Sequence, residues 1–115
     1  MSSKPKNKNQ KIRPKEVFSI KEFVNAIKKK EFPVQYELTG TVKYRYRLVA
    51  WSEDRIVLNI SRFAPNKGFQ SFNVDVAKMP LLAKDFMRFS RLAEKIGLIE
   101  EGTVREILED LKYEL

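Results

Sequence analysis

The spacing of hydrophobic residues changes twice along the chain. From residue 20 to about 30, apolar side chains recur at helical spacing. From residue 34 to 76 they alternate with polar ones, which is typical of strands with one buried face. Helical spacing returns over 81–96 and again after residue 103. The pattern predicts an α+β fold with an N-terminal helix, a four-stranded antiparallel sheet and two C-terminal helices.

Short motifs predict where the first helix begins and where the strands turn. Ser19 and Glu22 have the spacing of a capping box, and Phe18 and Phe23 have the spacing of a hydrophobic staple. We therefore expect a helix over about 20–30. Turn-forming residues interrupt the alternating region at 39–40, 52–54 and 64–68. These three turns divide the region into four strands.

The last apolar stripe belongs to a helix that needs a partner. Thr103 and Glu106 form a second capping-box pattern. A helix of about three turns is marginal alone in water, so its stripe must pack on this domain or on another copy of the chain. We predict oligomerisation, as a dimer or tetramer, through the stripe residues Val104, Ile107, Leu108, Leu111 and Leu115.

The two faces of the predicted sheet differ in chemistry, because side chains on a strand alternate between faces. The even-numbered positions are mostly apolar and predict the core face: Val34, Tyr36, Leu38, Val42, Tyr44, Tyr46, Leu48, Ile56, Leu58, Ile60, Phe72, Val74 and Val76. The odd-numbered positions mix cations, amides, hydroxyls and aromatic rings, and predict an open face.

The charge of the chain indicates a polyanionic ligand. The formal net charge is +8 and the sequence pI is about 9.8. Residues 1–15 carry six cations and no acid, which predicts a disordered basic arm with an accessory binding role or a merely solubilising one. Residues 16–99 remain basic and predict the binding domain, whereas the acidic segment 100–115 predicts the oligomerisation helix.

The composition disfavours enzyme classes that depend on cysteine or histidine. Both residues are absent, which excludes thiol nucleophiles, disulfides and most zinc sites. The acids of the strand region are too scattered to suggest a metal-dependent nuclease, so we expect no catalysis, metal or cofactor. No apolar run approaches a bilayer span or a secretory signal, and we therefore expect a cytoplasmic protein.

The odd-numbered positions combine the groups that bind unstacked nucleic acid. Cations can follow phosphates, aromatic rings can stack bases, and amides or hydroxyls such as Asn59, Ser61, Ser71 and Asn73 can bond to base edges or sugars. The predicted nucleic-acid contacts are Lys43, Arg45, Arg47, Trp51, Arg55, Asn59, Phe63, Lys67 and Phe69. No helix carries a cluster of basic and amide side chains suited to a major groove, which favours single strands over duplex DNA.

Other interpretations of the same residues stay open. Single-stranded RNA is also read by stacking on sheets, although no RNP-type motif is present. The charges on the odd-numbered positions can form a plain solvated face, and the aromatic rings can be buried by a helix or a subunit contact. In that case the chain is a protein-interaction or assembly module without strong nucleic-acid affinity.

The layout and the basic-aromatic stretch Thr39-Gly-Thr-Val-Lys-Tyr-Arg-Tyr-Arg-Leu-Val-Ala-Trp51 resemble the DNA-binding domain of the archaeal ThermoDBP-related proteins. The resemblance covers residues 16–99 and includes no short diagnostic motif, so it assigns no individual contacts. It implies single-stranded DNA binding by an oligomer. The thermophilic archaeal source that it implies agrees with a composition that is 33% charged and free of cysteine. The long coiled-coil tail of ThermoDBP itself is absent, which favours the shorter relatives.

Overall fold

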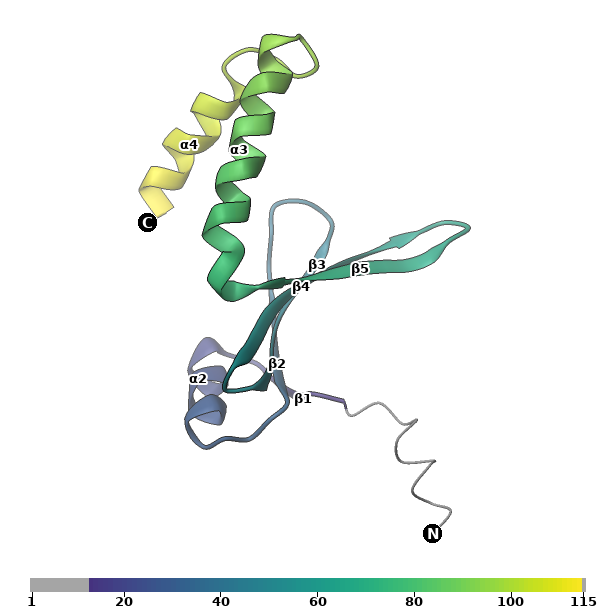
Figure 1. The fold of residues 1–115 in the computed structure, drawn as a ribbon, viewed down its shortest axis with the longest axis vertical. Coiled ribbons are helices and arrows are strands. Elements are labelled where there is room, and N and C mark those ends of the chain that lie inside the picture. The colour runs from purple at the N-terminus through teal and green to yellow at the C-terminus, as the bar shows by residue number, and fades with distance from the viewer. Residues whose placement is uncertain (1–12, 115) are drawn as a thin grey trace. The chain divides into compact units, whose positions relative to one another are not determined.

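The structure, a computed structural model, describes residues 13–114 and divides into two compact units between Val76 and Ala77 (Figure 1). The elements of the first unit are β1 (Lys15–Val17), α2 (Ile20–Lys28), β2 (Val34–Leu38), β3 (Arg45–Ser52), β4 (Arg55–Ala64) and β5 (Gly68–Asp75). A short 3-10 helix, η1 (Val76–Lys78), then leads into α3 (Met79–Lys95) and α4 (Thr103–Glu114). The predicted α+β class and order of elements are confirmed.

The sheet has five strands in the order β1-β2-β3-β4-β5, one more than predicted. The additional strand, β1, pairs in parallel with β2, and the other neighbours are antiparallel. Its first residue, Lys15, was predicted to belong to the disordered arm, but its backbone N–H donates to the Pro33 carbonyl at 2.9 Å. Residues 1–12 of the predicted arm lie outside the described residues.

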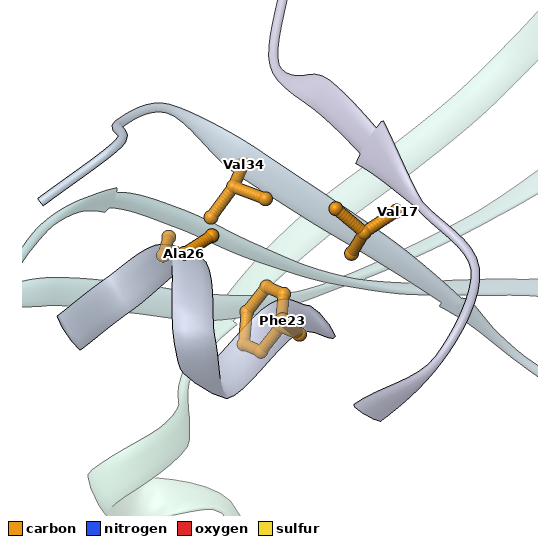
Figure 2. Close-up of a cluster of buried hydrophobic side chains, with 5 residues drawn as sticks. Val17, Phe23, Ala26 and Val34 are labelled. Atoms are coloured by element: carbon orange, nitrogen blue, oxygen red, sulfur yellow. The ribbon is translucent and has the colours of Figure 1, made fainter. Parts of the chain in front are cut away.

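A small core forms where α2 packs on β1 and β2 (Figure 2). The helix begins as predicted, because the Ser19 hydroxyl accepts from the Glu22 N–H at 3.1 Å and the Glu22 carboxylate accepts from the Phe18 N–H at 2.9 Å. Phe23 and Ala26 face Val17 and Val34 in this core. The predicted hydrophobic staple is wrong, since Phe18 is 79% exposed while Phe23 is buried.

The predicted core face is only partly buried. Close to α2, the even-numbered Val34 and Ala50 are fully buried, and Leu48 and Ile56 pack against them. Phe72, farther along the sheet, is exposed. Two other even-numbered residues, Val42 and Tyr44, are exposed in the loop between β2 and β3 rather than on a strand. A helix of nine residues is too short to cover the full length of strands β4 and β5.

The far ends of β4 and β5 form a two-stranded ribbon (Figure 1). β3 follows β4 only as far as the pair Arg45 and Ser61, whereas β4 and β5 continue to the pair Ala64 and Gly68. The ribbon turns at 65–67, where Lys67 N–H donates to the Ala64 carbonyl at 3.0 Å. Asn66 and then Gly68 take positive φ values of 75° and 77°, a conformation that asparagine and glycine tolerate best.

The second unit is a pair of helices with little buried surface. Among its described residues only Val104 is a buried hydrophobic, although α3 packs against α4. The predicted second capping box is wrong, because Thr103 is already helical and its hydroxyl donates to the Glu100 carbonyl at 2.6 Å. Glu94 of α3 replaces it, since its carboxylate accepts from the Val104 N–H at 2.8 Å. Within residues 13–114, no helix has both the length and the apolar character to span a bilayer.

Candidate nucleic-acid interface

The odd-numbered strand residues form one side of the sheet, which we call the odd face. Register places Arg47 of β3 beside Asn59 of β4, and Asn59 beside Asn73 of β5. The prediction of a fully open face is wrong at three positions, because Val49, Val57 and Ser61 are buried. Strand alternation assigns these residues to the correct face of the sheet, but it does not predict which side chains on that face are buried.

The predicted contacts are distributed over the sheet, its loops and its ribbon. Lys43 was expected on the sheet but lies exposed in the loop between β2 and β3. Lys67 is exposed in the turn of the ribbon. The remaining predicted contacts lie on strands: Arg45, Arg47, Trp51, Arg55, Asn59, Phe63 and Phe69.

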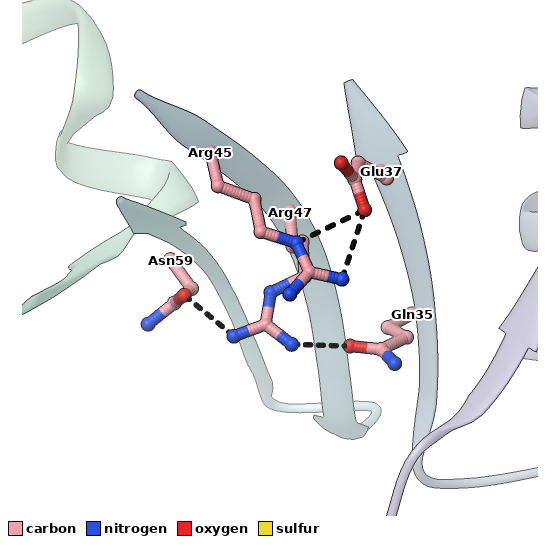
Figure 3. A network of polar contacts seen from close by, with 5 residues as sticks. All are labelled: Gln35, Glu37, Arg45, Arg47 and Asn59. Carbon is pink, nitrogen blue, oxygen red and sulfur yellow. Dashed lines mark hydrogen bonds and ion pairs between the residues drawn. The ribbon is translucent and has the colours of Figure 1, made fainter. Parts of the chain in front are cut away.

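A hydrogen-bond network joins four strands across the odd face, and Figure 3 shows its part on β2, β3 and β4. Arg47 donates from Nη1 to Gln35 Oε1 at 3.2 Å and from Nη2 to Asn59 Oδ1 at 2.9 Å. Asn59 in turn donates to Asn73 Oδ1 at 2.8 Å. The network holds the Arg47 guanidinium in place with neutral amides, and Arg47 forms no ion pair with a carboxylate among the described residues, although Glu37 lies opposite it on β2.

Arg45 differs from Arg47 in its electrostatics. Its Nη2 lies 3.0 Å from Glu37 Oε1, and its Nε donates to the same oxygen at 3.1 Å (Figure 3). Both side chains are about half exposed, so solvent weakens this ion pair. Arg45 is therefore a partly neutralised cation, whereas the sequence alone suggested a free one.

A shallow hollow of about 500 Å³ lies over the centre of this network. Its lining combines cations, amides and one indole: Arg13, Pro14, Glu16, Gln35, Arg45, Arg47, Val49, Trp51, Asn59 and Asn73. The Nε atom of Arg47 is buried and has no hydrogen-bond partner among the described residues. A buried donor of this kind is unusual, since most are paired in folded proteins.

Trp51 lies at an irregularity of the sheet beside Arg55. The register between β3 and β4 shifts between Ala50 and Ser52, so Trp51 is the extra residue of a β-bulge. The Arg55 guanidinium carbon lies 6.0 Å from the centre of the Trp51 ring, within the range of a cation–π contact. The bulge thus presents an indole that is 36% exposed next to an exposed cation.

Phe63 and Phe69 occupy the ribbon directly opposite one another. Their ring centres are 5.4 Å apart at an interplanar angle of 73°, which is an edge-to-face arrangement. They are 61% and 74% exposed, so the contact between them leaves most of each ring open to solvent. The structure therefore brings aromatic rings to two separate places on the odd face, at the bulge and on the ribbon.

No family model, curated protein or solved structure matches this chain. The resemblance to ThermoDBP-related proteins therefore stays a prediction. Within residues 13–114, no group of three or more Asp or Glu side chains is placed to hold a metal ion.

Sequence reasoning missed Gln35, Glu37 and Arg13 as parts of this surface. Gln35 and Glu37 are odd-numbered residues of β2, which the register places opposite Val49 and Arg47 of β3, on the same face as the two arginines. Extending the alternation rule to β2 would have found both. Arg13 had been assigned to the disordered arm, and no pattern in the sequence signals its place beside the hollow.

We expect Arg47 to matter more for stability than Arg45. Arg47→Met removes two hydrogen bonds from a charged donor and leaves part-buried amide oxygens unpaired, so the free energy of unfolding should fall by about 1–3 kcal/mol. Arg45→Met removes an exposed ion pair and should lower the free energy of unfolding by less than about 1 kcal/mol. Urea denaturation of both variants measures the difference, and equal losses would show that the network does not hold the strands together.

Proposed function

We propose that this chain is a non-catalytic single-stranded DNA-binding protein with little sequence preference. The observation that carries the proposal is the exposure of Trp51, Phe63 and Phe69 on the same sheet face as several cations. Large exposed aromatic side chains are uncommon on a folded surface, and three on one face indicate a flat, apolar ligand. Bases of an unpaired strand have this property, whereas bases in a duplex are stacked on one another.

The cations of the face fit different positions along a phosphate backbone. Arg55 and Lys67 are exposed and form no ion pair among the described residues, so each can bind a phosphate without first leaving a carboxylate. They also lie beside aromatic residues, Arg55 over Trp51 and Lys67 in the turn next to Phe69. A base stacked on either ring would bring its own phosphate close to a cation.

The hollow around Arg47 suits a phosphate or a base carbonyl. An acceptor that entered it would meet a guanidinium whose charge has only amide partners. If the Arg47 side chain turned so that Nε faced that acceptor, Nε would donate to it. The unpaired donor would then gain the hydrogen bond that it lacks in the free protein.

The second unit supports self-association as part of the same proposal. Its exposed apolar residues include Phe86, Phe89 and Ile96 on α3. On α4, the predicted oligomerisation residues Ile107, Leu108 and Leu111 are exposed, whereas Val104 is buried within its own chain and is not available to a partner. Leu115 lies outside the described residues. A second copy would cover these stripes, and the protein would act as a homo-oligomer in the cytoplasm.

The same exposed apolar residues also favour the alternative, an assembly module without strong nucleic-acid affinity. Fluorescence anisotropy with labelled single-stranded DNA, single-stranded RNA and duplex DNA at low and moderate salt separates the two functions. We expect salt-sensitive binding that prefers single-stranded DNA, because counterions are released from the strand. Preference for RNA would change the ligand class, and equal, weak binding to all three would favour the assembly module.

A further inference from the structure

The helix α3 carries a second basic surface. It belongs to the second unit, whereas the odd face belongs to the first. Lys84, Arg88, Arg91 and Lys95 are all exposed, and we call them the basic stripe. Their spacing of four, three and four residues places them on one side of the helix. At a rise of 1.5 Å per residue, the stripe is about 16 Å long.

The charges of the stripe are nearly free of acidic partners. Of the four stripe residues, only Arg88 forms an ion pair with a described residue, Asp85 at 3.5 Å, and both side chains are well exposed. Glu94 lies between Arg91 and Lys95 in sequence, but its carboxylate accepts the hydrogen bond from the Val104 N–H. Glu94 keeps its negative charge near the stripe, but it holds the start of α4 and forms no ion pair with a stripe residue.

Cations from α4 extend the stripe across a groove between the two helices. Arg91 lines a hollow of about 220 Å³ together with Arg105 and Lys112 of α4, and its other lining residues are one acid, Glu109, and Leu108 of the proposed self-association surface. Arg91 also lines a second hollow, of about 630 Å³, with Arg88 and Lys95, along with Leu92, Glu94 and Glu101. Arg91 is thus shared by two hollows, each of which has more cations than acids.

We propose that the basic stripe is a second binding surface for the phosphate backbone of single-stranded nucleic acid. It shares its ligand class with the proposed function but uses none of the odd-face residues. The stripe has no aromatic side chain among its members, so it would contact phosphates and contribute nothing to base stacking. Evenly spaced cations on a straight helix suit a regular chain of phosphates, and they give affinity without sequence preference.

A membrane surface fits this helix pair less well than a nucleic-acid strand. A basic amphipathic helix can lie on anionic lipid. However, the segment that follows α3 carries exposed acids, among them Glu101, Glu106, Glu109 and Asp110. A broad anionic surface would approach these acids together with the stripe and be repelled, whereas a single strand can follow the stripe alone.

The test is the salt dependence of binding to a labelled oligothymidylate. In the double variant Arg91→Gln/Lys95→Gln, two phosphate contacts are lost, and the slope of log K against log salt should fall in magnitude by about 1.4. Glutamine is a good helix former, so α3 should persist, which circular dichroism checks. The matched control is Lys28→Gln/Lys29→Gln, which removes the same charge from exposed positions at the end of α2.

The outcomes separate this proposal from the proposed function. A slope that falls no more than in the control overturns the second surface. The second surface is also overturned if the variant loses binding to phosphatidylserine vesicles while its salt slope on oligothymidylate is unchanged, because the stripe would then bind membranes. If alanine at Trp51 and Phe69 has no effect while the stripe variant lowers the slope, only the odd face is overturned. No binding of oligothymidylate by the unmodified protein overturns both.

Discussion

Replacing Trp51 or Phe69 with alanine is expected to raise the Kd for single-stranded DNA about fivefold to 150-fold at each site, equivalent to about 1–3 kcal/mol per stacked base. Phe69 is 74% exposed and Trp51 is 36% exposed, and neither belongs to the buried cluster around Phe23. Urea denaturation of each variant separates any loss of stability from the loss of affinity. The salt slope should stay close to that of the unmodified protein, because stacking releases no counterions. Combining the two substitutions should give roughly additive losses, since the bulge and the ribbon are separate places on the sheet.

Phe72→Ala is the matched control for Phe69→Ala. Phe72 lies on the same strand and is 51% exposed, but it is on the opposite face of the sheet. Its replacement should leave the affinity unchanged. Trp51 is the only tryptophan of the chain, so its fluorescence provides a direct second measurement: it should be quenched when a base stacks on the indole. Wild-type affinity in both odd-face variants would rule out stacking as the source of binding.

Replacing Phe23 with alanine is expected to lower the free energy of unfolding of the sheet unit by about 3–5 kcal/mol. Phe23 is 4% exposed and is the largest side chain in the small cluster between α2 and the sheet. A core of this size has few other contacts to compensate, so the loss is a large part of the total stability. Urea denaturation followed by Trp51 fluorescence reports on this unit alone.

Phe18→Ala provides the comparison for Phe23→Ala. It removes the same atoms from a ring that is 79% exposed only five positions earlier, and its effect on the urea midpoint should be small. If both variants unfolded at the same urea concentration, the cluster around Phe23 would not be what stabilises the sheet. Reduced DNA binding by Phe23→Ala would then need an explanation other than unfolding.

The strand boundaries were predictable because turn chemistry is local. Residues 52–54 and 64–68 mark turns with acids, proline, asparagine and glycine, and β3, β4 and β5 begin or end within a few residues of them. β1 was not predictable, since three residues that pair in parallel with β2 carry no alternation of their own. The second capping box is wrong because of a tertiary contact. The carboxylate of Glu94, rather than the hydroxyl of Thr103, accepts a hydrogen bond from a backbone N–H in the first turn of α4.

The composition of the candidate interface was predictable, but its electrostatics were not. Alternation placed Arg45 and Arg47 on one face, and they do share it. The register places Glu37 opposite Arg47, but the side chains reach diagonally, so that Arg45 contacts the Glu37 carboxylate and Arg47 contacts the Gln35 amide. Strand alternation does not predict this difference. The basic stripe of α3 was not predicted, because that helix was predicted only from the apolar spacing of residues 81–96.

The position of β5 at the end of the strand order leaves one of its sides without a strand partner in the described sheet. From Gly68 to Val74 this edge has no charged residue and no proline, the features by which sheets usually prevent pairing with other chains. At low salt a net charge of +8 keeps molecules apart, but the Debye length shrinks from about 10 Å at 0.1 M to about 3 Å at 1 M. The strand that presents Phe69 to a ligand is therefore also the expected starting point for aggregation at high salt.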